Sequence, residues 1–341
     1  MQHTWDLTYS MTATLDVNKG ILTIKTTQDS EPMPNFINAS NTPWYTVRSV
    51  IVSIILEVGI STIGDFAFYG LDKLTSVTIP NSVTNIGISS FQDCSSLTYI
   101  TIPNSVLTIG YYAFTDCIDL KSITIPDLIL SISALTFQRC INLSSVTIGN
   151  SVKVIQNGAF EDCKSLTSVT IPNSVITIQN GAFRNCSNLT SVTIPNSVAT
   201  IGDRTFSNCT QLKDITVNWI IPLSITNNVF QGVRAADVNL HVPLETENLY
   251  KAAPYWKDFK IVTYAVGNES VDYLTLKVYK SNGILHITGL YPGESFGIYN
   301  LNGQLLYKSV AKTEWEYIPF IGHGIYVVVA GERSIKIDLI N

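Results

Sequence analysis

Phenylalanine recurs every 23 residues through the middle of this chain of 341 residues, and an isoleucine precedes each one by five positions. The copies are Phe68, Phe91, Phe114, Phe137, Phe160, Phe183 and Phe206. A fixed period of about 20 to 50 residues is typical of a solenoid, whose repeats bury their apolar faces only against neighbouring repeats. The period therefore predicts a stack of coils with one repeat in each coil.

Each repeat contains one short strand and a segment that returns to the core. In one copy Leu74, Val77 and Ile79 point inward along the strand, and Pro80 and Asn81 follow as a turn. Side chains alternate across a strand, so the threonine beside each inward residue is expected on the outside. This pattern predicts a mainly β fold built around a parallel sheet.

The ends of a solenoid expose its core and need caps. We assign residues 1–46 to an N-terminal β-hairpin cap and residues 47–264 to the solenoid with its C-terminal cap. Val238, Leu240 and Val242 predict the last strand, and the segment from Glu245 to Trp256 predicts a short closing helix.

A second domain is expected over residues 265–341, where the 23-residue period is absent. The boundary is placed at residues 265–270, which include Gly267, Asn268 and Ser270. The short alternating strands and turn residues beyond it predict a small immunoglobulin-like β-sandwich.

Two polar or reactive columns recur in the repeats. All six cysteines stand three residues after a phenylalanine, which favours buried packing over a metal cluster or a chain of disulfides. Asp93, Asp116 and Asp162 precede cysteines and could suggest a calcium ladder, but Arg139 takes the same place. Turn or capping roles are therefore the favoured interpretation of this column.

Composition and motifs exclude several classes of function. The formal charge is −5 and the chain has no basic stripe, so nucleic acid is not expected as a partner. No apolar run reaches the about 18 residues needed to span a bilayer, and the first residues do not form a signal peptide. No catalytic or phosphate-binding motif occurs. We predict a protein that is not an enzyme and that has no metal or cofactor.

The repeat body resembles a known family. Leu-Thr-Ser-Val-Thr-Ile-Pro-Asn-Ser-Val at 189–198, followed by Ile-Gly and then Phe and Cys, is similar to the BspA-like leucine-rich repeats of bacterial surface proteins, common in Bacteroides and relatives. The resemblance implies a right-handed leucine-rich-repeat solenoid that adheres to host extracellular proteins or to other cells. Residues 298–304 and 324–329 resemble a secretion-sorting or anchoring sandwich. Together they imply a secreted or outer-surface protein whose signal peptide is missing from this chain.

The outward columns of the sheet are the candidate binding surface, because a partner can span them from coil to coil. An aromatic side chain on such a surface could anchor a protein partner. The candidate residues are Thr78, Tyr99, Thr101, Lys121, Thr124, Thr147, Thr170 and Thr193.

Three alternatives to protein binding stay open at this point. A glycan-binding protein would stack sugar rings on exposed aromatic side chains, for which the candidates are Trp44, Tyr45, Trp219 and Tyr255. A structural surface component would associate with itself. Regular hydroxyl rows on a parallel sheet also resemble the ice-binding arrays of some antifreeze proteins.

Overall fold

The computed structural model describes residues 1–264, 276–281, 284–313, 315–320, 324–331 and 333–339. The chain divides into two compact units, Met1–Tyr264 and Ala265–Asn341. The domain boundary expected at residues 265–270 lies outside the described residues.

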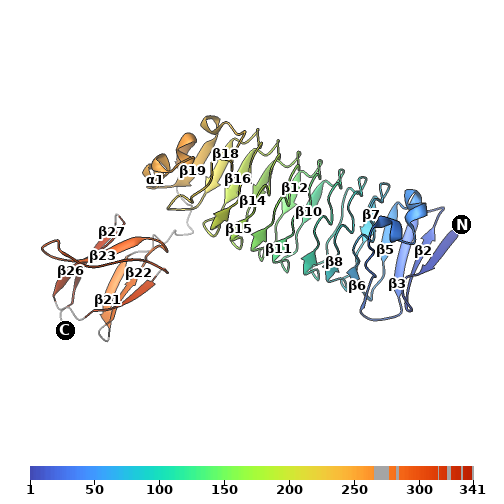
Figure 1. Ribbon diagram of the computed structural model, residues 1–341, viewed down its shortest axis with the longest axis horizontal. Helices are drawn as coiled ribbons and strands as arrows, with labels where there is room; N and C mark the ends of the chain where they lie inside the picture. The colour runs from blue at the N-terminus through green and yellow to red at the C-terminus, as the bar shows by residue number, and fades with distance from the viewer. Residues whose placement is uncertain (265–275, 282–283, 314, 321–323, 332, 340–341) are drawn as a thin grey trace. The chain divides into compact units, whose positions relative to one another are not determined.

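The first unit is a β-solenoid of 23-residue coils, as the phenylalanine period predicts (Figure 1). One side of it, called here the strand side, carries the longer strands of each coil. Parallel partners lie one repeat apart, for example Ser122 opposite Ser145 and Ser168 opposite Ser191. The strands on this side are β5 (Ser53–Leu56), β7 (Ser76–Thr78), β10 (Ser122–Thr124), β12 (Ser145–Thr147), β14 (Ser168–Thr170), β16 (Ser191–Ile194), β18 (Asp214–Val217), β19 (Asn239–Pro243) and β20 (Lys260–Tyr264).

A second side carries a parallel row of short strands, and Figure 1 shows the two rows as separate lines of arrows. These strands hold the isoleucine of each repeat, which points into the core, so that Ile155 pairs with Ile178. The strands are β4 (Glu31–Pro32), β6 (Ile60–Ile63), β8 (Asn85–Ile86), β9 (Thr108–Ile109), β11 (Ser131–Ile132), β13 (Val154–Ile155), β15 (Thr177–Ile178) and β17 (Thr200–Ile201).

The third side, called here the turn side, contains the phenylalanine and cysteine of each coil. Alternate residues donate backbone hydrogen bonds to the next coil, as Leu135 N does to Asn157 O (3.0 Å) and Phe137 N to Ala159 O (2.9 Å). The residues two before and two after each phenylalanine have positive φ, for example Leu135 at 60° and Arg139 at 56°. The aspartate column that precedes the cysteines therefore consists of left-handed turn residues.

Caps close both ends of the unit. At the N-terminus β1 (Gln2–Asp6), β2 (Met11–Asp16) and β3 (Ile21–Thr26) form an antiparallel meander, and β3 pairs in parallel with β5. Two 3₁₀ helices, η1 (Ala39–Asn41) and η2 (Tyr45–Val50), complete this end. At the other end lie η3 (Ala235–Asp237), α1 (Glu247–Ala252) and η4 (Trp256–Asp258).

Two expectations about the strands were wrong. The strand around Leu240 is not the last, because β20 adds in parallel to β19, with Leu240 opposite Ile261. The 23-residue period does not reach β20, since the cap helices intervene. Residues 99–101 also form no strand, although Lys121 N still donates to Thr98 O in the neighbouring coil (3.0 Å). The strand-side ladder is interrupted there because the paired bonds that define a strand are not made.

The core of the first unit is a stack of phenylalanine rings. From Phe91 to Phe230 successive ring centroids are 5.3–5.5 Å apart and the planes are within 10° of parallel. Trp44 covers one end of the stack by packing on Phe68, and Trp256 packs against Phe230 at the other. Stacked aromatic pairs of this kind add to the free energy gained by burial.

The cysteine column lies beside this stack, and all six cysteines are free and buried. Each thiol donates to the carbonyl oxygen of a phenylalanine 26 residues earlier, as Cys140 Sγ does to Phe114 O (3.2 Å). Burial raises the pKa of every one of these thiols. The cysteines therefore act as small core residues with a polar contact.

Burial and a raised pKa make these thiols unreactive in the folded protein, because the thiolate is the nucleophile. We expect Ellman's reagent at pH 8 to modify none of them in native buffer and all six in guanidinium chloride. The absorbance of the released thionitrobenzoate measures the reaction. Fast modification of the native protein would show that the column opens readily, and it would contradict a rigid stack.

The second unit is a small β domain of two antiparallel sheets. The first contains β21 (Lys277–Ser281), β22 (Ile284–Thr288) and β25 (Trp315–Pro319). The second contains β23 (Ser295–Asn300), β24 (Leu305–Val310), β26 (Ile325–Ala330) and β27 (Arg333–Asp338). Leu285, Phe296 and Val328 lie in its core.

Candidate functional site

The threonines expected on the outside of the sheet form a column on the strand side, although the ladder of strands beneath it is interrupted at Thr101 and between β12 and β14. Thr124 lies opposite Thr147, and Thr170 lies opposite Thr193. Thr193 is half-buried and the other five of the column are exposed. None of these six hydroxyls makes a hydrogen bond within the part of the chain that the structure describes. Adjacent strands are about 4.8 Å apart, so the column offers donors and acceptors at a regular spacing.

Tyr99 and Lys121 extend this surface near its N-terminal half. The Tyr99 side chain is 63% exposed and Lys121 is also exposed. Tyr99 and Thr101 lie in the segment that makes no regular strand. We call the eight residues together the threonine face: Thr78, Tyr99, Thr101, Lys121, Thr124, Thr147, Thr170 and Thr193.

Hydroxyls in the neighbouring column are used differently. Thr75, Ser144 and Thr190 each donate to a carbonyl oxygen of the preceding coil, at 3.0, 3.1 and 2.9 Å. They tie the coils together at the start of each strand. The outward threonine column therefore leaves its hydroxyls available to a partner, as do exposed serines beside it such as Ser145 and Ser168.

Most aromatic candidates for sugar stacking do not offer a free ring face. Trp44 is 1% exposed and Trp219 is 7% exposed, because both lie inside the caps. The guanidinium of Arg48 covers the Tyr45 ring at 4.2 Å from its centroid. Tyr255 is exposed and has a left-handed backbone, with φ of 66°. The proposed use of the two tryptophans as sugar platforms is therefore wrong.

A hollow of about 500 Å³ does lie beside Tyr45, on the turn side near the N-terminal cap. Its lining includes Arg48, Phe66, Tyr69 and Asp93. A hydrogen bond to Asp93 raises the pKa of Tyr69 to about 12. The Tyr69 hydroxyl therefore stays protonated as a donor over the physiological range of pH.

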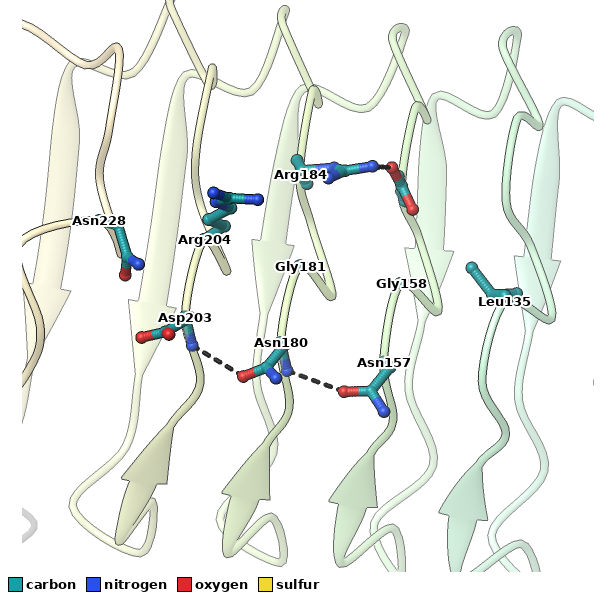
Figure 2. Close-up of a pocket in the computed structure, with 10 residues that line it drawn as sticks. Leu135, Asn157, Gly158, Asn180, Gly181, Arg184, Asp203, Arg204 and Asn228 are labelled. Atoms are coloured by element: carbon teal, nitrogen blue, oxygen red, sulfur yellow. Dashed lines mark hydrogen bonds and ion pairs between the residues drawn. The ribbon is translucent and has the colours of Figure 1, made fainter.

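A second hollow lies on the turn side of the C-terminal coils and has a volume of about 430 Å³ (Figure 2). We call it the arginine groove. It is lined by Leu135, Asn157, Gly158, Glu161, Asn180, Gly181, Arg184, Asp203, Arg204 and Asn228.

The asparagines of the groove are held in a row by hydrogen bonds between coils. Asn157 Oδ1 accepts from Asn180 N (3.1 Å), and Asn180 Oδ1 accepts from Asp203 N (2.9 Å). Figure 2 shows both bonds as dashed lines along one edge. The edge therefore has one fixed polar side chain in each coil.

Two arginines reach over the groove from consecutive coils. Arg184 Nε donates to Glu161 Oε1 (2.7 Å), and a second guanidinium nitrogen contacts the same oxygen. Arg204 points from its own coil towards that of Gly181 (Figure 2). No hydrogen bond or ion pair to the Arg204 guanidinium is found among the described residues.

The arginine groove was not predicted from the sequence, although one signal for it exists. The position two before the phenylalanine holds Phe66, Ser89, Tyr112 and Leu135 in four coils, and then Gly158 and Gly181 in the next two. Two successive losses of a side chain at one surface position indicate a depression. Motifs for catalysis or binding are defined by the residues present, so a gap in a column does not match any of them.

Within the described residues, no group of three or more His, Cys, Asp or Glu side chains is placed to hold a metal ion. No helix in the same residues is long and apolar enough to cross a bilayer.

A comparison with protein families decides what kind of repeat this is. The family model for the BspA type leucine rich repeat region matches residues 45–164 and 130–251, with six copies. These residues make up more than half of the chain. The chain belongs to this family. The BspA-type repeats begin close to η2 and end within α1.

Solved structures of bacterial proteins with leucine-rich repeats are similar to this BspA-type chain. A leucine rich cell surface protein from Faecalibacterium prausnitzii is 21% identical, and the match covers 71% of this chain and 89% of that chain, with a TM-score of 0.39. The leucine rich repeat protein of T. pallidum is 28% identical over 59% and 86% of the two chains, with a TM-score of 0.46. One from Bacteroides ovatus is 19% identical over 76% and 99%, with a TM-score of 0.39. No curated protein matches this chain.

Proposed function

We propose that this protein is a non-enzymatic binding protein of the bacterial surface, and that the threonine face binds an extracellular protein of the host or of another cell. The observation that carries the proposal is the column of mostly exposed hydroxyls that have no hydrogen-bond partner among the described residues, beside the exposed ring of Tyr99. One solved relative is itself named a cell surface protein, which supports the same location for this chain. The second unit, residues 265–341, is proposed as a sorting or anchoring domain.

A protein partner suits the threonine face better than a small ligand. Neither of the two hollows described above is lined by a residue of the threonine face, and small ligands bind in concave sites. A protein can cover several coils at once and pair with the hydroxyls of each. Tyrosine is enriched among the residues that contribute most to such interfaces, so Tyr99 is the expected anchor.

Tyr99→Ala is expected to weaken binding about tenfold or more, as loss of an interface anchor does. The measurement is biolayer interferometry of the full chain against immobilised fibronectin, fibrinogen and collagen. Tyr111→Ala is the matched control, because Tyr111 is 47% exposed in the same coil but lies on the turn side.

Equal losses from the two tyrosine variants would contradict binding through the threonine face. Absence of binding to every protein tested would contradict matrix adhesion. Growth of particles in light scattering under the same conditions would then favour a self-associating surface component.

A further inference from the structure

We propose that the arginine groove binds an acidic saccharide, a sugar whose ring carries a carboxylate, such as a uronic or sialic acid. The Arg204 guanidinium would bind the carboxylate, and the asparagine edge would bind the hydroxyls. This inference goes beyond the proposed protein binding, because the groove lies on the turn side and shares no residue with the threonine face.

The hollow lies where two successive coils carry glycine at the same position. Gly158 and Gly181 have φ of 58° and 63°, and Leu135 and Arg204 have φ of 60° and 57° at the same position of their coils. The backbone there is thus compatible with a side chain. A Cβ added to Gly181 would meet no atom closer than Arg184 Cβ, at 3.7 Å, whereas a Cβ at Gly158 would lie 2.6 Å from Leu135 Cδ2. Gly181 therefore leaves open space, and the space at Gly158 is bounded by the Leu135 side chain.

The two arginines of the groove differ in how their charges are paired. Glu161 is 7% exposed, and its carboxylate accepts from Arg184 on one oxygen and from Gln138 Nε2 on the other (3.2 Å). Arg184 is thus neutralised and held in place, whereas Arg204 has no partner within the described residues. A guanidinium binds a carboxylate through two parallel hydrogen bonds, so Arg204 supplies a fork for this group.

The edge of the groove presents polar side chains in fixed orientations. The backbone N–H groups of Asn180 and Asp203 donate to the Oδ1 atoms of Asn157 and Asn180, which fixes the orientation of both amides. Each Nδ2 group remains a donor with no partner among the described residues. Asp203 Oδ1 accepts from the Thr226 hydroxyl (2.7 Å), and its other oxygen can accept from a ligand. Such mixed donors and acceptors suit sugar hydroxyls.

The charge balance and the size of the groove distinguish an acidic sugar from a simple anion. Glu161 and Asp203 balance the charges of Arg184 and Arg204, so net charge alone does not hold an anion in the groove. A ligand must therefore contact both the Arg204 guanidinium and the hydroxyl-binding edge, which an acidic sugar can do and phosphate cannot. The volume of about 430 Å³ lies in the range of sites for small ligands and exceeds the need of a single inorganic anion.

The test is isothermal titration calorimetry of the full chain with D-glucuronate and N-acetylneuraminate. D-glucose and inorganic phosphate are titrated as comparisons. Saturable binding of one molecule of an acidic sugar is expected, at least about tenfold tighter than that of glucose, since a charge-assisted bond is lost in the neutral sugar. Preference for one acidic sugar would identify the source of the carboxylate.

Two variants locate the site. Arg204→Gln should weaken the binding of acidic sugars about tenfold and leave the affinity for glucose unchanged. Gly181→Leu should abolish binding, because it fills the hollow with the side chain that Leu135 already carries in its own coil. Tyr112→Leu is the control at the same position outside the groove, and it should bind as the unaltered chain does.

Circular dichroism and melting temperature check that each variant is folded. If Gly181→Leu does not fold, the exposed Arg204→Gln variant still decides the matter. Binding of glucose or phosphate as tight as that of the acidic sugars would overturn the proposal. So would a lack of binding to both acidic sugars, or unchanged affinity in Arg204→Gln.

Discussion

Phe137→Ala is expected to lower the free energy of unfolding by about 3–5 kcal/mol, the cost of removing a large aromatic side chain from a core. Phe137 is fully buried and stacks between Phe114 and Phe160, at centroid distances of 5.5 and 5.3 Å. The variant loses both stacking contacts and leaves a cavity in the middle of the solenoid. Urea unfolding followed by circular dichroism measures the change.

Leu130→Ala is the control, since Leu130 belongs to the same coil but is 61% exposed. We expect it to change the free energy of unfolding by no more than about 0.5 kcal/mol. Similar effects from the two substitutions would show that the phenylalanine stack does not dominate stability. Phe137→Leu should fall between them, because it refills part of the cavity without restoring the stack.

Trp44→Ala is expected to destabilise the protein by a similar amount, about 3–5 kcal/mol, and also to promote self-association. The Trp44 ring covers the end of the stack at 5.8 Å from the Phe68 centroid, and its Nε1 donates to Ala67 O (3.0 Å). Its loss uncovers an apolar coil end, the feature that caps of repeat proteins exist to hide. Thermal unfolding and light scattering coupled to gel filtration measure the two effects.

Tyr45→Ala tests whether this effect belongs to the cap rather than to the N-terminal region in general. The Tyr45 ring lies next in sequence but contacts Arg48 and not the stack. A much smaller change in melting temperature is expected for this variant. A Trp44→Ala protein that stays monomeric with an unaltered melting temperature would contradict the role of Trp44 as a cap.

Much of the fold could be predicted because the period determines which residues must meet. Phe137 can bury its ring only against the rings one repeat away, so its position implies the stack. The cysteine column follows in the same way, because each cysteine stands three residues after a phenylalanine, as Cys140 does after Phe137. The strand β20 could not be predicted from the period, since its apolar residue Ile261 stands outside the repeat and pairs only after the cap helices have turned the chain.

The two candidate sites differ in the same way, since one could be predicted from the sequence and the other could not. Alternation along the strand predicted that Thr124 and its equivalents would lie outside, because that direction depends only on local geometry. The arginine groove depends on where the side chains of residues with positive φ point and on hydrogen bonds between coils. Neither follows from the local sequence. The repeat period and the alternation along each strand were therefore enough to predict the solenoid and the threonine face. The pairing of Arg184 and the lack of a partner for Arg204 among the described residues depend on the folded arrangement, because a hydrogen-bond partner is selected by distance in space.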